Sequence, residues 1–172
     1  MLAVDKVDFH KGDSPGSHSM DIHRLTHLGP ETLSLLVEHG RAALGESALD
    51  EWMLPVIASC GLIYAGKLGD EIVGAAEILG FLESSDLYLE GFYIRPEFQG
   101  RGRGAELMFG VKELLVREGF SRMLVTIDPD NKAGMKLYER TGFREVDFLS
   151  DYYGRGRNRL LLAVDLGGSG RS

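Results

Sequence analysis

The stretch PEFQGRGRG, Pro96–Gly104, decides how this sequence folds. It follows DLYLEGFYI (Asp86–Ile94), which is typical of a strand, and leads into GAELMFGVKELLVREG (Gly104–Gly119), whose apolar residues recur at helical spacing. The N-terminus of a helix presents unpaired backbone N–H groups and the positive end of its dipole. Glycines let an anion approach these groups closely because they have no Cβ. The context favours a loop that binds a phosphate group, although the glycines alone would equally fit a tight turn.

Two other phosphate-binding loops do not fit this stretch. No Lys-Ser/Thr pair follows the glycines, and they read G-x-G-x-G instead of the dinucleotide-binding G-x-G-x-x-G. Binding to nucleic acid is a further alternative, because this loop and GRGRNR (Gly154–Arg159) both contain arginines between glycines. The net charge of −7 and the pI of about 5.2 argue against a general nucleic-acid-binding protein.

The composition is that of an ordinary globular protein, and 172 residues suffice for one domain. We expect this domain at residues 20–166, with a flexible leader at 1–19 and a flexible tail at 167–172. A single cysteine, Cys60, excludes a disulfide within the chain and is expected to be a small buried apolar residue. The histidines lack metal-ligand spacing, and no apolar run reaches transmembrane length. We therefore expect a cytoplasmic protein without a metal.

The rest of the chain alternates between strand and helix patterns. We expect strands at 20–26, 86–94, 122–127 and 159–166, one more beginning at 143, and a hairpin within 61–82 that turns at Gly69-Asp70. Helices are expected at 30–44, 48–59, 104–119 and 131–142, with Pro55 breaking or kinking the second. Three antiparallel strands followed by a β-α-β unit predict a mixed α/β sheet.

Two motifs resemble those of the GNAT acyltransferase superfamily. YIRPEFQGRGRGAELM (Tyr93–Met108) resembles its motif A, Q/R-x-x-G-x-G/A, which is filled here by Gln99, Gly102 and Gly104. DNKAGMKLYERTGFRE (Asp130–Glu145) resembles its motif B. The resemblance implies a mixed, mostly antiparallel sheet of about seven strands with splayed fourth and fifth strands, flanked by about four helices. It also implies acetyl-CoA or a related acyl-CoA as the acyl donor.

The resemblance further implies which residues hold the donor. Backbone groups of Phe92, Tyr93 and Ile94 would hold the pantetheine and the thioester carbonyl, and one N–H would stabilise the developing oxyanion. Asn131 would contact the cofactor arm, or it would simply cap its helix. Backbone amides would hold the pyrophosphate, and the residues concerned are Gln99, Gly100, Arg101, Gly102, Arg103, Gly104 and Ala105.

The catalytic acid and base follow less directly. Tyr138 would also contact the cofactor, with its phenol near the sulfur. It matches the position where the family commonly has the acid that protonates the leaving thiolate, although it would also suit packing as a helix aromatic. Glu90 lies among apolar neighbours in a strand and is the favoured base, with Glu77 and Asp128 as alternatives. The C-terminal part resembles the ribosomal-protein N-terminal alanine acetylases, but Thr126 stands where those enzymes have their base glutamate.

The sequence leaves two kinds of acceptor substrate, a small-molecule amine or a protein N-terminus. Tyr152 and Tyr153 would form an acceptor wall or pack in the core. The predicted function is transfer of an acetyl group from acetyl-CoA to a primary amine by direct attack in a ternary complex, and a non-catalytic acyl-CoA-binding module is the alternative. A homodimer fits the family. Four residues would receive a cationic amine or form a charged helix face: Glu46, Asp50, Glu51 and Trp52.

Overall fold

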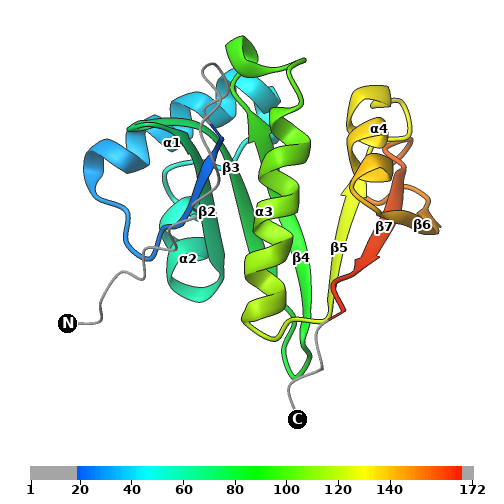
Figure 1. The fold of residues 1–172 in the computed structure, drawn as a ribbon. Coiled ribbons are helices and arrows are strands. Elements are labelled where there is room, and N and C mark those ends of the chain that lie inside the picture. Colours follow the sequence, from blue (N-terminus) through cyan, green and yellow to red (C-terminus); the bar gives the residue numbers. More distant parts are fainter. Residues whose placement is uncertain (1–18, 168–172) are drawn as a thin grey trace.

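The protein is a seven-stranded sheet with four α-helices, and the computed structural model describes residues 19–167 (Figure 1). The leader and the tail predicted from the sequence lie outside the described range, apart from residues 19 and 167. The strands are β1 Asp21–Arg24, β2 Leu62–Leu68, β3 Glu71–Gly80, β4 Asp86–Ile94, β5 Arg122–Ile127, β6 Arg144–Leu149 and β7 Arg159–Asp165. The helices are α1 Pro30–Leu44, α2 Met53–Cys60, α3 Arg103–Arg117 and α4 Lys132–Arg140, with 3-10 turns η1 Gly45–Ser47 and η2 Pro96–Phe98.

The sheet order is β1-β2-β3-β4-β5-β7-β6, and only β4 and β5 pair in parallel. The predicted order of elements and the mixed, mostly antiparallel fold are confirmed. Two apolar clusters hold the layers together on opposite faces of the sheet. The apolar stripe of α3, which includes Leu107 and Val111, packs in one cluster, and Leu36 of α1 and Ile57 of α2 pack in the other.

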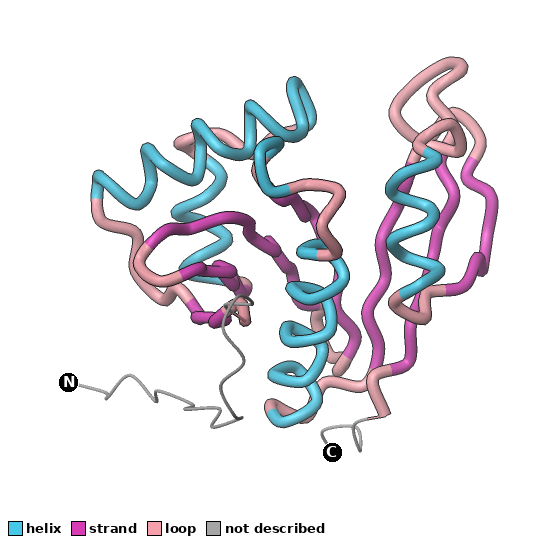
Figure 2. The backbone as a smooth tube through the Cα atoms, turned by 45° about the horizontal axis from the view of Figure 1, so that its top comes forward, coloured by secondary structure: helices cyan, strands magenta, loops and turns pink. Residues whose placement is uncertain are grey.

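The parallel pair β4–β5 opens after three residue pairs. Asp86, Leu87 and Tyr88 pair with Arg122 to Leu124, and beyond Tyr88 the two strands diverge (Figures 1 and 2). A β-bulge follows, because Glu77 of β3 pairs with Gly91 while Ile78 pairs with Leu89. A bulge bends its strand and increases the twist, so β4 turns away from β5 at this point. The splay of the fourth and fifth strands is thus present.

Three expectations from the sequence are wrong. The helix expected at 48–59 begins only at Met53. In the turn before it, Asp50 Oδ1 accepts the Met53 N–H at 2.9 Å, so the chain at Asp50 forms a turn instead of helix. Pro55 then lies in the first helical turn, where it removes no intrahelical hydrogen bond and causes no break. Cys60 is exposed and is not part of the core. Within residues 19–167, no helix is long and apolar enough to cross a membrane.

Candidate active site

The loop between β4 and α3 is built as an open turn. Gly100 and Gly102 have φ of 73° and 78°, a backbone conformation that favours glycine, and Gly102 is the N-cap of α3. A Cβ at either position would meet no atom within 4 Å, so the space above both is open. The Gln99 side chain donates to the Ile94 carbonyl at 2.8 Å and fixes the loop to the end of β4. The first amides of α3 therefore face accessible space.

This loop forms one wall of a cleft of about 460 Å³, which we call the α3–α4 cleft. It gathers every cofactor-binding residue predicted from the sequence except Arg101 and Tyr138. The cleft is lined by Ala43, Leu44, Phe92, Tyr93, Ile94, Gln99, Gly100, Gly102, Arg103, Gly104, Ala105, Asn131, Ala133, Gly134, Lys136, Leu137 and Arg140.

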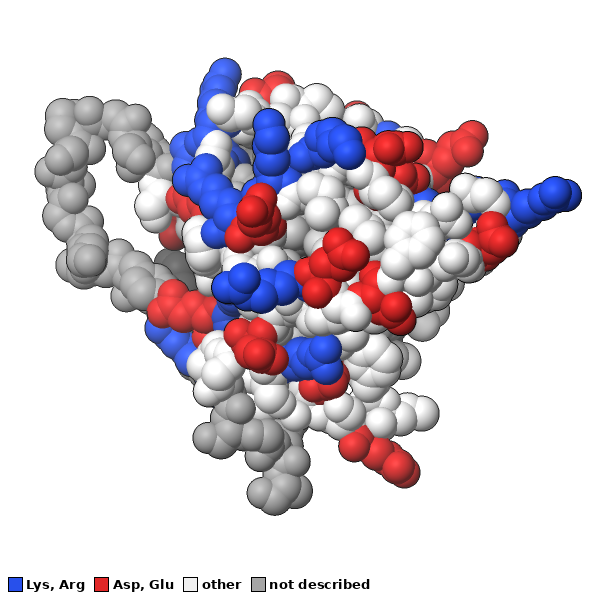
Figure 3. Space-filling view, turned by 90° about the vertical axis from the view of Figure 1, so that its right-hand side faces the viewer, with Lys and Arg blue, Asp and Glu red and all other residues white. Residues whose placement is uncertain are grey.

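Basic residues concentrate at this cleft although the chain is acidic overall. Arg103, Lys136 and Arg140 line it, and its described lining residues include no carboxylate, although Arg103 pairs with Glu106 of α3 at 2.7 Å. Seen from the side of β6 and β7, Lys and Arg side chains gather at the upper left of the molecule (Figure 3). Lys136 and Arg140 were not predicted from the sequence as site residues. Their i,i+4 spacing, which places both on one face of a helix, could have indicated a basic surface there. The cleft is suited to a ligand with several negative charges.

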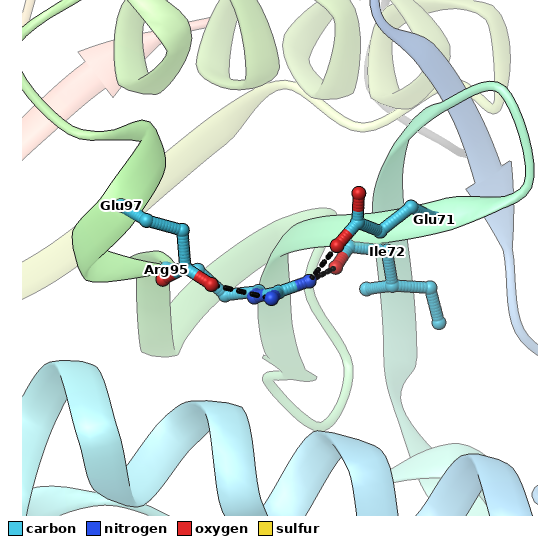
Figure 4. Close-up of polar contacts among 4 residues, drawn as sticks. All are labelled: Glu71, Ile72, Arg95 and Glu97. Carbon is cyan, nitrogen blue, oxygen red and sulfur yellow. Dashed lines mark hydrogen bonds and ion pairs between the residues drawn. The ribbon is translucent and has the colours of Figure 1, made fainter.

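Arg95 joins the start of the loop to the start of β3 (Figure 4). Its guanidinium donates to Glu71 at 2.6 Å and to the Ile72 carbonyl at 3.1 Å, and it also pairs with Glu97. The same group lies 5.2 Å from the centre of the Phe98 ring. Since one planar cation binds acceptors on β3 and on the loop, the path of the loop is fixed by side-chain contacts as well as by its glycines.

Arg95→Ala is expected to lower the free energy of unfolding by about 1–2 kcal/mol, because the partly buried hydrogen bond to the Ile72 carbonyl and the charge-assisted bonds to Glu71 and Glu97 are lost together. Arg41→Ala is the matched control. It removes an exposed pair with Glu51 at 3.2 Å, which is expected to cost about 0.5 kcal/mol or less. Urea unfolding of both variants measures the difference, and equal losses would show that the Arg95 network does not stabilise the loop.

A pair of carboxyl groups lies where β4 leaves β5. Glu90 is the extra residue of the bulge and is partly exposed, and burial raises its pKa. Glu77 is only 2% exposed, and its Oε2 has no hydrogen-bond partner among the described residues. Burial, with the negative charge of Glu90 as a smaller cause, raises the pKa of Glu77 to about 7. Burial thus raises the pKa of both carboxyl groups.

Three tyrosines border the same region. The Tyr88 hydroxyl lies 2.7 Å from Thr126 Oγ1, so one hydrogen bond still connects the diverging strands. Burial is the main cause that raises the pKa of Tyr88, and Tyr153, Tyr152 and Glu90 contribute through their charges. Tyr152 and Tyr153 are 48% and 45% exposed and stack edge to face with ring centres 4.8 Å apart. Core packing of this pair is therefore excluded, and the acceptor wall stays a prediction.

Tyr138 is buried and packs edge to face on Phe143, with ring centres 5.1 Å apart. Burial raises its pKa, and its hydroxyl makes no hydrogen bond to the part of the chain described here. Packing as a helix aromatic is thus present, and the acid role remains a prediction. Asn131 caps α4, since its Oδ1 accepts the Gly134 N–H at 2.9 Å, and it also lines the cleft.

The remaining acidic candidates have structural partners. Asp128 pairs with Arg159 at 3.0 Å and accepts the Asp130 N–H at 2.9 Å, so both of its oxygens are engaged. Asp50 Oδ1 accepts the Trp52 and Met53 N–H groups, and Glu51 pairs with Arg41. None of the four residues proposed to receive a cationic amine, Glu46, Asp50, Glu51 and Trp52, lines the α3–α4 cleft.

Comparison with known proteins agrees with this geometry. The sequence model of the Acetyltransferase (GNAT) family matches residues 29–143. The chain belongs to this family. Two solved structures share the GNAT fold over most of the chain. The ribosomal-protein-S18-alanine N-acetyltransferase of Escherichia coli has a TM-score of 0.74 at 18% identity and covers 89% of this chain and 97% of its own. A GNAT acetyltransferase of Elizabethkingia anophelis with acetyl-CoA bound has a TM-score of 0.68 at 15% identity, covering 87% and 99%.

Matches to curated sequences are shorter. A thialysine N-epsilon-acetyltransferase of Bos taurus is 31% identical over 61 residues, which is 36% of this chain and 36% of that protein. A mycothiol acetyltransferase of Renibacterium salmoninarum is 28% identical over 85 residues, which is 49% of this chain and 21% of that protein. The matched segments span less than half the length of each of these GNAT relatives.

Proposed function

We propose that this GNAT protein transfers an acetyl group from acetyl-CoA to a primary amine, by direct attack of the amine in a ternary complex. The observation that carries the proposal is the opening of β4 and β5 after Tyr88, next to a cleft lined by glycines and basic residues. An extended thioester needs such a gap for its reactive end and such a cleft for its phosphates.

The residues of the α3–α4 cleft fit acetyl-CoA. The open space above Gly100 and Gly102 admits a pyrophosphate to the first amides of α3, and Arg103, Lys136 and Arg140 add positive charge. Arg101 is exposed at the edge of the same loop. The backbone of β4 from Phe92 to Ile94 would hold the pantetheine, because beyond Tyr88 it has no partner in β5. When bound, acetyl-CoA supplies an activated acyl group.

Glu90 is the proposed base, because it is a partly exposed carboxylate at the bulge where the strands separate. It would take a proton from the acceptor ammonium, directly or through one water molecule. A backbone N–H of β4 would stabilise the negative charge that develops on the thioester oxygen. Tyr152 and Tyr153 would form one wall of the acceptor site, since both rings are exposed and stacked on each other and both lie close enough to Tyr88 to contribute to its raised pKa.

Amines of different size fit this arrangement. The bovine relative is named for acetylation of an N-epsilon amine, and the Escherichia coli neighbour for acetylation of a protein N-terminal alanine. Both acceptors are primary amines, and we propose the same class here, as a small molecule or as a protein N-terminus. The cytoplasm, where acetyl-CoA is available, is the proposed location.

The test is incubation with acetyl-CoA and a panel of primary amines and peptides with free N-termini. We expect release of the CoA thiol together with a product that gains one acetyl group by mass spectrometry. The non-catalytic alternative predicts saturable acetyl-CoA binding with no acetylated product for any acceptor. Absence of both binding and transfer at millimolar acetyl-CoA would contradict the proposal.

Tyr138→Phe tests the proposed acid. If the hydroxyl protonates the leaving thiolate, the variant is expected to lose about 100-fold in kcat while its affinity for acetyl-CoA stays within about 2-fold. The aromatic packing on Phe143 is kept by phenylalanine, so stability should change little. Steady-state kinetics and calorimetry separate the two effects. Unchanged kcat would leave Tyr138 with its packing role only.

A further inference from the structure

Glu77 is a buried carboxyl group that the proposed reaction leaves unused. It lies in the middle of β3, opposite Ile63 of β2 and Gly91 of β4. Its side chain is on the same face as Ala75 and Leu79, which pack in the cluster beneath α1 and α2. Its Oε2 has no hydrogen-bond partner among the described residues, and a negative charge on such a buried carboxyl is costly, so the group is expected to keep its proton or to serve a function.

The backbone of β4 makes room for this group. A Cβ at position 91 would collide with Glu77 Oε2, so the carboxyl occupies the space that a side chain at Gly91 would fill. Gly91 is also the residue next to Glu90, the extra residue of the bulge. The bulge and the glycine together bring a buried carboxyl beside a partly exposed one.

The charged groups around Glu77 leave Glu90 as its electrostatic partner. Burial comes first and the charge of Glu90 second in raising the pKa of Glu77, and the charge of Glu77 in turn adds to the raised pKa of Tyr93. Ile63 on β2 is apolar, and α2 has no charged side chain between its first and last residues. His39 on α1 interacts with Arg95, Glu38, Glu97 and Glu71. The apolar stripe of α3 packs on the opposite face of the sheet.

We propose that Glu77 and Glu90 form a two-carboxyl unit across the β4 bulge, in which buried Glu77 keeps a proton while Glu90 is ionised. Glu77 is then a positioning residue that sets the pH range in which Glu90 accepts a proton from the acceptor amine. The inference rests on the proposed function for its catalytic part, whereas the coupling of the two carboxyls is a property of the protein alone.

Glu90 and Glu77 ionise at different pH values because they differ in exposure to solvent. Glu90 reaches solvent and ionises first, and its charge then opposes ionisation of Glu77. Between the pKa of Glu90 and about pH 7, the unit holds one proton and one negative charge. Above about pH 7, Glu77 also ionises, and the second charge strengthens both the basicity of Glu90 and the attraction of the site for an ammonium group.

The coupling is measured by NMR titration of carboxyl 13C in the protein without substrates, with the Glu77 signal assigned by its loss in Glu77→Gln. We expect a midpoint near 7 in the wild type and a lower midpoint in Glu90→Gln, which removes the opposing charge. A midpoint that Glu90→Gln leaves unchanged, or one near 4.5 in the wild type, would overturn the proposal. Neither result depends on acetyl transfer, so failure of the proposed function is distinguished from failure of the unit.

Stability gives a second measure. The pKa of Glu77 is higher in the folded chain than its ordinary 4.5, so the native state binds this proton more tightly than the unfolded state does. Its stabilising effect is complete below about pH 4.5 and is lost as the pH rises to about 7. The wild type should therefore lose stability relative to Glu77→Gln between these two pH values. A constant difference between the two proteins would contradict a protonated Glu77.

The catalytic part is tested by the ratio of kcat/KM between Glu77→Gln and the wild type. We expect a ratio near one at pH 6 and a loss of roughly 3- to 10-fold in the variant at pH 8.5, because only the wild type gains the second charge. Glu145→Gln, an exposed carboxylate on β6, is the control and should give a flat ratio. A flat ratio for Glu77→Gln would limit Glu77 to a structural role. If Glu77→Gln does not fold, the wild-type titration compared with Glu90→Gln still decides the proposal.

Discussion

Gly102→Val is expected to weaken acetyl-CoA binding by about 100-fold or more while the protein stays folded. Gly102 has a φ of 78° and is the N-cap of α3, and the space above it is open. A branched side chain there would fill the space through which an anion reaches the first amides of the helix. Loss of one or two hydrogen bonds to a charged group, at about 1.5–3 kcal/mol each, gives this magnitude.

The control for this substitution is Gly69→Val, which introduces a similar backbone strain away from the cleft. Gly69 has a φ of 61° in the β2–β3 turn, and a Cβ there also meets no atom within 4 Å. Both variants should lose about 1–2 kcal/mol of stability from the unfavourable φ. Calorimetry should show normal acetyl-CoA affinity for Gly69→Val only. If Gly102→Val binds as the wild type does, the loop is a turn and not the phosphate site.

Glu90→Gln is expected to lower kcat/KM for the amine by about 100-fold or more, since a positioned general base contributes about that much. The amide has nearly the same shape and remains partly exposed at the bulge, so folding and acetyl-CoA affinity should be unchanged. The loss should be greatest where the acceptor is protonated and shrink at high pH, where the amine is already neutral.

Rate measurements from pH 6 to pH 10, with Glu145→Gln as the control, test this role. Glu145 is an exposed carboxylate on the edge strand β6 and does not line the α3–α4 cleft. Its variant should retain wild-type rates at every pH. If Glu90→Gln and Glu145→Gln behave alike, the proton is removed elsewhere, and Glu77 or a water molecule becomes the candidate.

The parts of the fold predicted correctly from sequence depend on local signals. A strand, a loop of glycines and an amphipathic helix follow one another within 34 residues, Asp86–Gly119, so their geometry is fixed by neighbours along the chain. Asn131 was predicted as a helix cap for the same reason, and its side chain accepts the Gly134 N–H. Local patterns of this kind also predicted nearly all the strands and helices.

The parts that were missed depend on register between distant segments. The sequence does not show that Glu77 faces Gly91, since this requires the pairing of β3 with β4 and the bulge at Glu90. The exposure of Tyr152 and Tyr153 depends on the turn between β6 and β7. The late start of α2 follows from competition between a side-chain acceptor and a backbone acceptor. The Asp50 side chain accepts the Met53 N–H, and the residues before Met53 form a turn instead of helix.

A crystal structure with acetyl-CoA bound is the most direct test of the central claim, that the gap between β4 and β5 is an acetyl-transfer site. We predict the pyrophosphate at the backbone amides between Gly100 and Ala105, and the thioester carbonyl beside Phe92 to Ile94, with Glu90 at the open side of the gap. A complex with the thioester outside this gap, or with the phosphates away from the α3 N-terminus, would contradict the account.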